Sequence, residues 1–210
     1  MTYPQSTQDL PIIVRAIKQG RVVAFPTGTA YGLAVDALQG HSLQRLRNLK
    51  QRPQEKSFSV FMKEILWEKF LQLTAEENAL LRQLSGQPVT LLVKPKPSLA
   101  HLAQDGLIGL RVIDHPLMQG LAAAVSTPLT ATSANLSGQE PCFAPACIRQ
   151  QFPGKIDDST YDLSLAVILD AGTLPKNSPS TIAKLINGQV TILREGAVSA
   201  AAISNKCKVL

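Results

Sequence analysis

Aromatic residues and cysteines are scarce in this chain of 210 residues. Phe, Trp and Tyr together make up 5% of it, so it lacks the aromatic run on which many RNA-binding modules stack unpaired bases. The three cysteines, Cys142, Cys147 and Cys207, are too few and too scattered for a disulfide framework, and the three histidines share no ligand spacing with them. We therefore expect a reduced, cytoplasmic protein without structural metal.

Long apolar runs and several signature motifs are absent as well. No segment approaches the roughly 20 apolar residues of a membrane-spanning helix, and the N-terminal segment has no apolar run behind a basic head. The sequence thus predicts neither a membrane span nor a signal peptide. It also contains no GxxxxGK(S/T) phosphate loop, no GxGxxG turn and no GxSxG elbow, which argues against the enzyme classes built on those motifs.

The remaining composition is that of an ordinary globular protein. Apolar residues make up 45% and charged residues 17%, and the length suits one domain with a sizeable core. Lys and Arg number 21 against 15 Asp and Glu, which gives a formal net charge of +6. A moderately basic surface fits an anionic partner such as a nucleotide or RNA. Many basic proteins bind neither, so the charge alone does not select a function.

Hydrophobic patterning predicts helices and strands that are mixed without strict alternation. An amphipathic helix begins at Leu10 and is ended by Gly20. Thr74 and Glu77 form a capping box before a helix that runs to about Leu84. Further helices are expected over 41–50, 116–125 and 144–152. Strands are expected over 21–25, 31–37, 58–62, 88–93, 107–113, 128–132, 165–172, 180–186 and 189–194.

These elements predict a single α/β domain with an open, twisted sheet of parallel and antiparallel strands and flanking helices. The last two strands are separated by Asn187-Gly188, which predicts a hairpin with a type I′ turn. We expect the domain to span residues 1–198, and residues 199–210 to form a C-terminal tail.

Two polar segments follow buried strands. PTGTAYGL (26–33) places two threonine hydroxyls and a glycine just past a strand, and TATSANLSG (130–138) is a run of hydroxyls and one amide at a strand end. Such turns offer backbone N–H groups and hydroxyls to a small polar ligand. A tight strand connection or a capping turn uses the same residues, so neither segment identifies a site by itself.

Five cations stand at positions where a ligand could use them. Lys50, Arg52 and Lys56 lie close together after a predicted helix, where Lys offers a point charge and Arg a fork that grips phosphate or carboxylate. The alternative is a solvated helix end favoured by the helix dipole. Arg111 lies inside the apolar strand LIGLRVI, where a charge needs a partner, and Arg194 ends the last strand. A salt bridge would explain these two arginines equally well.

Together these segments are far more specific than any one of them. PTGTAYGL, LKQRP with the following Lys56, PVT, GLRVIDHP, TSANLSG, SPSTI and LREG occur in the order, and at about the spacing, of the YrdC/YciO family. The chain resembles this family from about Val22 to Ala197. The resemblance implies an open α/β fold with a basic concave face. It also implies an L-threonylcarbamoyladenylate synthase, which combines L-threonine, bicarbonate and ATP and releases pyrophosphate for a tRNA modification.

The resemblance assigns roles residue by residue. Lys50 and Arg52 match the family's KxR pair and are expected to be catalytic. The residues expected to bind ATP are Arg52, Lys56, Ser133, Asn135 and Arg194. Those expected to bind threonine are Thr29, Arg111 and Ser180. No tightly bound cofactor is implied, and Mg²⁺ would arrive with ATP. The implied partners are ATP, L-threonine, bicarbonate, a downstream threonylcarbamoyl transferase system, and tRNA or double-stranded RNA.

Two positions depart from the family pattern. Gly28 stands where the family's PTET turn has an acid, and Ser57-Phe58 follows Lys56 where the family usually has Pro-Leu. Both departures are expected at the pocket wall, where they would affect substrate handling. Two other functions fit the chain: a non-enzymatic module that binds tRNA or double-stranded RNA, and a YciO-like protein with a different small substrate.

Overall fold

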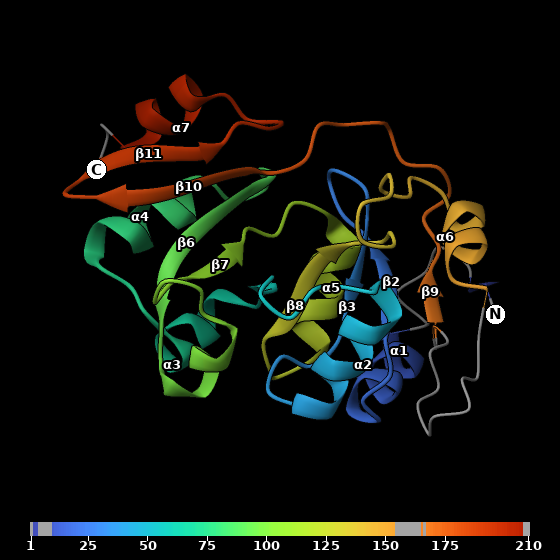
Figure 1. The fold of residues 1–210 in the computed structure, drawn as a ribbon. Helices are drawn as coiled ribbons and strands as arrows, with labels where there is room; N and C mark the ends of the chain where they lie inside the picture. Colours follow the sequence, from blue (N-terminus) through green and yellow to red (C-terminus); the bar gives the residue numbers. More distant parts are fainter. Residues whose placement is uncertain (1, 4–9, 154–164, 166, 208–210) are drawn as a thin grey trace.

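The computed structural model describes residues 2–3, 10–153, 165 and 167–207, and one twisted sheet runs through them (Figure 1). Its strands follow the order β1-β9-β2-β3-β8-β4-β7-β6-β10-β11, and β5 pairs with β6 beside this path. The strands are β1 (Thr2–Tyr3), β2 (Val23–Pro26), β3 (Tyr31–Ala34), β4 (Ser59–Phe61), β5 (Leu71–Gln72), β6 (Val89–Pro95), β7 (Ile108–Arg111), β8 (Leu129–Ser133), β9 (Val167–Leu169), β10 (Thr181–Ile186) and β11 (Gln189–Arg194).

The pairing confirms the predicted mixed sheet. β9 runs parallel to β1 and β2, β4 to β7, and β6 to β10, whereas the other neighbours are antiparallel. Two registers bring separate sequence motifs together: Gly32 lies opposite Ser133, and Thr90 lies opposite Arg111. Residues far apart in the chain therefore meet at the ends of neighbouring strands.

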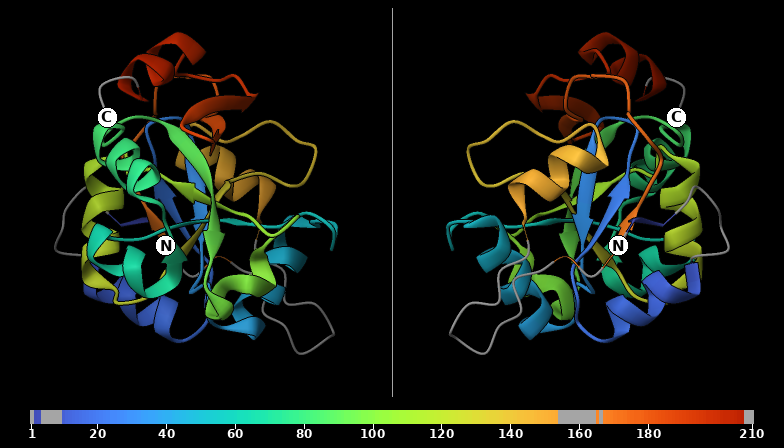
Figure 2. Two further views of the ribbon diagram at one scale, coloured as in Figure 1. Left: turned by 90° about the vertical axis from the view of Figure 1, so that its left-hand side faces the viewer. Right: turned by 90° about the vertical axis from the view of Figure 1, so that its right-hand side faces the viewer.

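Helices cover both faces of the sheet (Figure 2). They are α1 (Leu10–Lys18), α2 (Gly40–Lys50), α3 (Trp67–Phe70), α4 (Ala75–Gln83), α5 (Pro116–Ala124), α6 (Pro145–Gln151) and α7 (Ala200–Cys207), with 3₁₀ helices η2 (Glu64–Leu66) and η3 (Pro97–Leu102). In β2, Val23 and Phe25 pack with α1 and α5, whereas Ala24 belongs to the core cluster on the other face, which includes Leu46 of α2. Alternate strand residues point to opposite faces, so two cores sandwich the sheet.

Several local signals are confirmed by the geometry. The Thr74 side chain accepts from the Glu77 N–H, and the Glu77 carboxylate accepts from the Thr74 N–H, which completes the capping box of α4. Asn187 and Gly188 both have positive φ, at 49° and 74°, as a type I′ hairpin requires. Gly20, at φ 71°, follows the end of α1.

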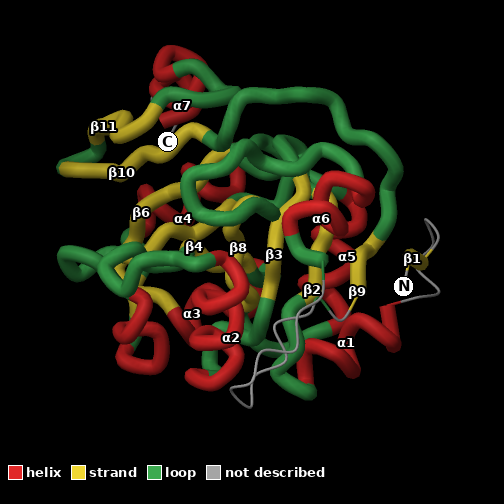
Figure 3. The backbone as a smooth tube through the Cα atoms, turned by 45° about the vertical axis from the view of Figure 1, so that its right-hand side comes forward, coloured by secondary structure: helices red, strands yellow, loops and turns green. Residues whose placement is uncertain are grey.

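The segment between β9 and β10 crosses most of the sheet. β9 and β10 lie near opposite edges in the strand order, so residues 170–180 have to span the strands between them. Figures 1 and 3 show this segment passing over one end of the sheet as a long loop. We call residues 170–180 the crossing segment.

The C-terminal residues differ from the expected tail. Residues 200–207 form α7, which packs on β11 and α4, and Ile203 is fully buried in the larger core cluster. The run Ala200-Ala201-Ala202 favours a helix, and the apolar side chain at Ile203 gives that helix a buried anchor. None of the helices in the described part of the chain combines the length and the apolar character needed to cross a membrane.

Candidate functional site

A cavity of about 470 Å³ opens where the central strands end. Its walls come from the β2–β3 turn, the end of β8, the first halves of β6 and β10, the end of β7, and the crossing segment. Six of the residues assigned roles from the sequence line it: Thr29, Arg52, Arg111, Ser133, Ser180 and Arg194. Lys50, Lys56 and Asn135 are not among the lining residues that the structure describes.

Arg111 is the most deeply buried cation of the cavity wall. Its guanidinium pairs with the Asp114 carboxylate and lies 3.5 Å from the Thr29 hydroxyl. Its Nε atom is buried and has no hydrogen-bond partner. Burial lowers the pKa of Arg111, and Asp114 opposes this shift. A buried donor that lacks an acceptor is costly, and the ion pair with Asp114 offsets part of the cost of burying this arginine.

The turn has Gly28 where the family usually has an acidic residue, and the Asp114 carboxylate lies beside this glycine. A Cβ at this position would lie 2.7 Å from the Asp114 carboxylate oxygen, and the Gly28 N–H donates to the same carboxylate at 3.1 Å. Asp114 therefore occupies the space beside the turn and supplies the negative charge there. The Gly28 carbonyl in turn accepts from the side-chain amide of Asn177 at 3.0 Å, which joins the turn to the crossing segment.

A second group of polar side chains lies on β6, on β11 and immediately before β10. The hydroxyls of Thr90 and Ser180 are 3.1 Å apart, and both side chains are buried. The Arg194 guanidinium donates to the Ser180 carbonyl at 2.7 Å and lies 3.3 Å from its hydroxyl. Arg194 is also close enough to lower the pKa of Arg111 further by repulsion. The two arginines thus form one positive wall.

Arg52 enters the cavity from the turn after α2 and is held by its own loop. Its guanidinium donates to the Ser57 carbonyl at 2.7 Å and to the Lys56 carbonyl at 3.3 Å, and it lies 5.0 Å from the centroid of the Phe58 ring. Arg47 contacts the same ring at 5.1 Å. Burial, and then repulsion from Arg47, lowers the pKa of Arg52. The electron-rich ring face offsets this charge crowding, which gives the Phe58 departure a physical role.

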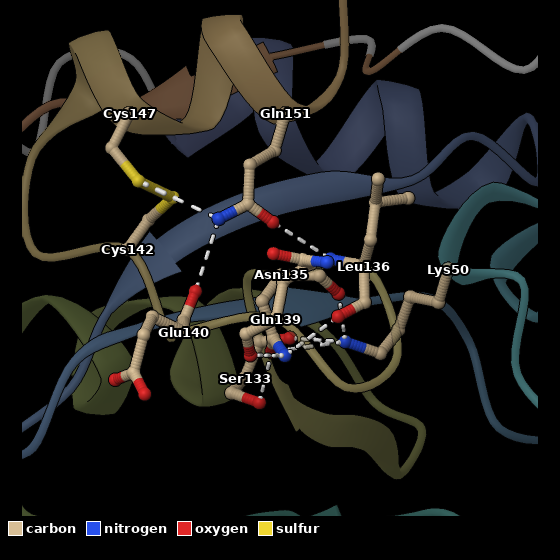
Figure 4. Close-up of a disulfide and its surroundings, with 9 residues drawn as sticks. All are labelled: Lys50, Ser133, Asn135, Leu136, Gln139, Glu140, Cys142, Cys147 and Gln151. Carbon is tan, nitrogen blue, oxygen red and sulfur yellow. Dashed lines mark hydrogen bonds between the residues drawn. A yellow bond between two sulfur atoms is a disulfide. The ribbon is translucent and has the colours of Figure 1, made fainter.

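The Ser133–Asn135 turn is supported from behind by Lys50 (Figure 4). Lys50 is 2% exposed, and its ammonium donates to the carbonyls of Ser133 at 2.5 Å and Asn135 at 2.7 Å. Burial, followed by repulsion from Arg52, lowers the pKa of Lys50 to about 7. The Asn135 amide donates to the carbonyls of Leu136 and Gln139. Lys50 and Asn135 therefore position the turn, and Ser133 presents its side chain to the cavity.

Lys56 is exposed on the loop after α2. Its carbonyl accepts from both Arg47 and Arg52, so its backbone holds the arginines. Its expected contact with phosphate stays a prediction.

Several cavity residues were not identified from the sequence. Thr90 stands in the apolar strand PVTLLV and lies opposite Arg111, a pairing that the polar residue within the strand could have indicated. Glu140 is the only carboxylate among the described lining residues. Asn177 lies in a Ser- and Pro-rich connection that carries no periodic signal.

The cysteines correct the expectation of a fully reduced protein. Cys142 and Cys147 form a disulfide, with their Cα atoms 5.4 Å apart, and Cys207 is free (Figure 4). The cysteine count predicted that there is no framework of several disulfides. It did not exclude a single bridge, which needs only two cysteines at a suitable distance. Cys142 lies on the loop before α6 and Cys147 within that helix, and the two therefore meet when the helix forms.

These features define an α/β protein with a polar, positively charged cavity for a small anionic ligand. Three arginines, one carboxylate and seven threonine or serine residues line it, the last being Thr27, Thr29, Ser59, Thr90, Thr132, Ser133 and Ser180. Such a wall suits a ligand with phosphate and carboxylate groups in one molecule, or two such ligands bound side by side. A family model for Sua5, YciO and YrdC proteins, described as telomere recombination, matches residues 15–196. The chain belongs to this Sua5/YciO/YrdC family.

Curated relatives and solved structures agree with this membership. The threonylcarbamoyl-AMP synthase of Vibrio parahaemolyticus is 33% identical over 192 residues, covering 88% of this chain and 97% of that protein. The enzyme of the same name from Aliivibrio fischeri is 36% identical over 183 residues, covering 80% and 98%.

Two solved structures share the fold. Sua5 of P. abyssi in complex with L-threonine matches with a TM-score of 0.81 at 22% identity over 98% of this chain. The chain spans 59% of that longer protein. E. coli YciO matches with a TM-score of 0.79 at 21% identity, covering 96% of this chain and 95% of YciO.

Proposed function

We propose that this chain is a threonylcarbamoyl-AMP synthase, a nucleotidyltransferase that makes threonylcarbamoyl-AMP and pyrophosphate from L-threonine, bicarbonate and ATP. Relatives that carry this name support the proposal. One structural observation carries it: residues assigned to ATP and to threonine from widely separated segments line a single cavity. A reaction that joins two small molecules needs both subsites in one place.

The threonine subsite in this proposal is built around Arg111. The threonine carboxylate would pair with the Arg111 guanidinium, and the hydroxyls of Thr29 and Ser180 would contact the polar groups of threonine. Asp114 holds the guanidinium in place through a buried ion pair.

The ATP subsite would use the remaining cavity cations. Arg52 and Arg194 would contact phosphate oxygens. The Ser133 hydroxyl donates to the Asn135 side-chain oxygen and would exchange this bond for one to the ligand. Lys50 and Asn135 would act through the turn that carries Ser133, so we propose them as positioning residues. Among the described residues, no three His, Cys, Asp or Glu side chains gather as a metal site. In the proposal, Mg²⁺ enters as part of the substrate, on the ATP phosphates.

The reaction joins two anions and so depends on positive charge. The threonine amine takes up carbon dioxide as a carbamate, the carbamate oxygen attacks the α-phosphorus, and pyrophosphate leaves. Negative charge then accumulates on phosphoryl oxygens, which pre-oriented arginines stabilise. The walls of the cavity would also limit the access of water to the mixed anhydride.

The product would serve a downstream threonylcarbamoyl transferase that modifies tRNA. Direct contact of this chain with tRNA or double-stranded RNA, and a cytoplasmic location, stay predictions. The net charge of +6 is compatible with RNA contact.

Pyrophosphate release tests the proposed function. Purified protein with ATP and Mg²⁺ should release pyrophosphate at a rate that rises strongly when threonine and bicarbonate are both present. Omission of either substrate should return the rate to background. Release that ignores threonine and bicarbonate would contradict the proposal and favour the rival with a different small substrate. Binding of double-stranded RNA without any release would favour the RNA-binding rival.

Replacement of Phe58 by leucine, the residue usual in the family, should weaken ATP use selectively. The ring stabilises Arg52 by a cation–π contact, and such contacts contribute about 0.5–2 kcal/mol. We expect the KM for ATP in Phe58→Leu to rise about 2- to 30-fold, with the KM for threonine nearly unchanged. Steady-state kinetics with each substrate varied in turn measure this effect.

A matched control is available at Phe70, whose ring lies 5.2 Å from the Lys69 ammonium and does not line the cavity. Phe70→Leu should lose comparable ring contacts and leave the KM for ATP unchanged. An equal effect of Phe58→Leu on both KM values would show that the ring has a general structural role instead.

A further inference from the structure

The Cys142–Cys147 disulfide belongs to the segment that forms one wall of the cavity. Glu140, Pro141 and Phe143 line the cavity immediately beside Cys142. The main chain of Cys142 is fixed on both sides, because its carbonyl accepts from the Tyr31 N–H at 2.9 Å and its N–H donates to the Ala134 carbonyl at 3.0 Å. Cys142 is therefore anchored to the two segments that carry the predicted ligand-binding turns.

The other end of the bridge lies in α6, which holds the same wall through one side chain. The Gln151 side-chain oxygen accepts from the Leu136 N–H at 2.8 Å, and its amide donates to the Glu140 carbonyl at 3.0 Å. The same amide lies 3.8 Å from the Cys147 sulfur (Figure 4). Gln151 thus spans the stretch between the Ser133–Asn135 turn and the cavity-lining residues.

The disulfide cross-links α6 to the cavity-lining loop that contains Cys142. α6 has only seven residues, and an isolated helix of that length is not stable in water. Its position depends on packing, on the hydrogen bonds of Gln151 and on the bridge to Cys142. If the bridge is broken, α6 loses the cross-link between Cys147 and Cys142, and main-chain connection, packing and the Gln151 contacts with Leu136 and Glu140 have to hold the wall.

We propose that Cys142 and Cys147 form a site of thiol–disulfide exchange that takes dithiol reductants as substrates and sets the position of the cavity wall 140–143. The inference rests on the proposed function only in taking this cavity as the substrate site. The oxidised state fixes the wall in the conformation described above. The reduced state releases α6 and lowers substrate affinity.

The exchange is balanced in atoms and electrons. A thiolate of the reductant attacks the half-buried Cys147 sulfur, because Cys142 is fully buried. The disulfide breaks, and Cys142 leaves as a thiolate that takes up a proton. The second thiol of the reductant then displaces Cys147 from the mixed disulfide. The protein gains two electrons and two protons, and the dithiol becomes a cyclic disulfide.

The test compares the two redox states of the full chain. Thiol titration under denaturing conditions should find one free thiol, Cys207, in the oxidised protein and three after treatment with dithiothreitol. Calorimetry should then show several-fold weaker binding of ATP to the reduced protein. Hydrogen–deuterium exchange should be faster in residues 136–151 of the reduced form and unchanged in α4, which lies in another part of the fold.

Single-cysteine variants provide the controls. Cys147→Ala should resemble the reduced protein and no longer respond to dithiothreitol. Cys207→Ala should respond as the wild type does, because Cys207 lies near Gly188 and does not line the cavity. A protein that makes no product but shows the exchange difference would refute the proposed function and leave this site intact.

Two results would overturn the inference. One is equal ATP affinity and equal amide exchange in the two states, with the change in thiol count verified. The other is a protein that keeps three free thiols after incubation with glutathione disulfide, since the pair would then not form the bridge.

Discussion

Arg111→Met should lower both the stability of the protein and its affinity for threonine. The Asp114 side chain is 1% exposed and pairs with Arg111, so the substitution leaves a buried carboxylate whose remaining partner is the Gly28 N–H. Removal of one member of a buried ion pair costs about 3–5 kcal/mol. We expect the free energy of unfolding in urea to fall by about this amount, and threonine binding to become undetectable by calorimetry.

A double variant separates the two effects. In Arg111→Met with Asp114→Asn, no charge is left buried, and the asparagine oxygen still accepts from Gly28. The double variant should recover much of the lost stability and none of the threonine affinity. Recovery of threonine binding in the double variant would show that Arg111 serves only the fold. Unchanged stability in the single variant would contradict the account of the buried pair.

Arg52→Ala should strongly reduce the catalytic efficiency of the enzyme. Arg52 is a half-buried residue of the cavity wall. Its guanidinium lines the cavity and is oriented by the Lys56 and Ser57 carbonyls. Hydrogen bonds to charged groups contribute about 1.5–3 kcal/mol, and the transition state carries more phosphate charge than the ground state. We expect kcat/KM for ATP to fall about 10- to 150-fold.

Two controls give this prediction its specificity. Arg82 pairs with Glu64 on the surface, with side chains 62% and 53% exposed, so Arg82→Ala removes an equal charge away from the cavity. It should leave kcat/KM unchanged and alter stability by less than about 1 kcal/mol. Arg52→Lys keeps the charge but loses the planar fork, and we expect an intermediate rate. Equal rates for Arg52→Ala and the wild type would remove Arg52 from the site.

Much of the fold could be predicted because hydrophobic periodicity and local signals agree. The capping box at Thr74 and the Asn187-Gly188 turn act within a few residues, so the sequence alone specifies them. The strand order could not be predicted, since it depends on which distant segments pair. The short elements α3, β5 and η3 were missed, because such short runs carry little periodic signal. The C-terminal helix was missed because its anchor is a single buried residue, Ile203.

The family resemblance indicated which residues lie at the cavity better than it indicated where each side chain points. The family resemblance identified Arg52, Arg111 and Arg194, and all three line the cavity. It did not show that the Lys50 ammonium binds the carbonyls of the Ser133–Asn135 turn and that Lys50 is not among the cavity-lining residues. Helical spacing could have indicated the burial of Lys50, because it follows Leu43 and Leu46 at seven and four residues and so shares the buried face of α2.

The disulfide shows a different limit of the sequence. Cys142 and Cys147 are five residues apart, but the pairing depends on where the loop meets α6. Cysteine spacing alone does not determine connectivity. The same holds for Asn177 and Glu140, which reach the cavity because the chain folds back over the strand ends.

The central claim is that this cavity joins threonine, carbon dioxide and the AMP part of ATP. It is tested most directly by incubating the protein with isotope-labelled bicarbonate, threonine and Mg-ATP, and by separating the nucleotides. The account predicts that label appears in an AMP derivative that also contains threonine, in amounts equal to the pyrophosphate released. It also predicts that little label appears with Arg52→Ala. Pyrophosphate release without label in any nucleotide would contradict the account.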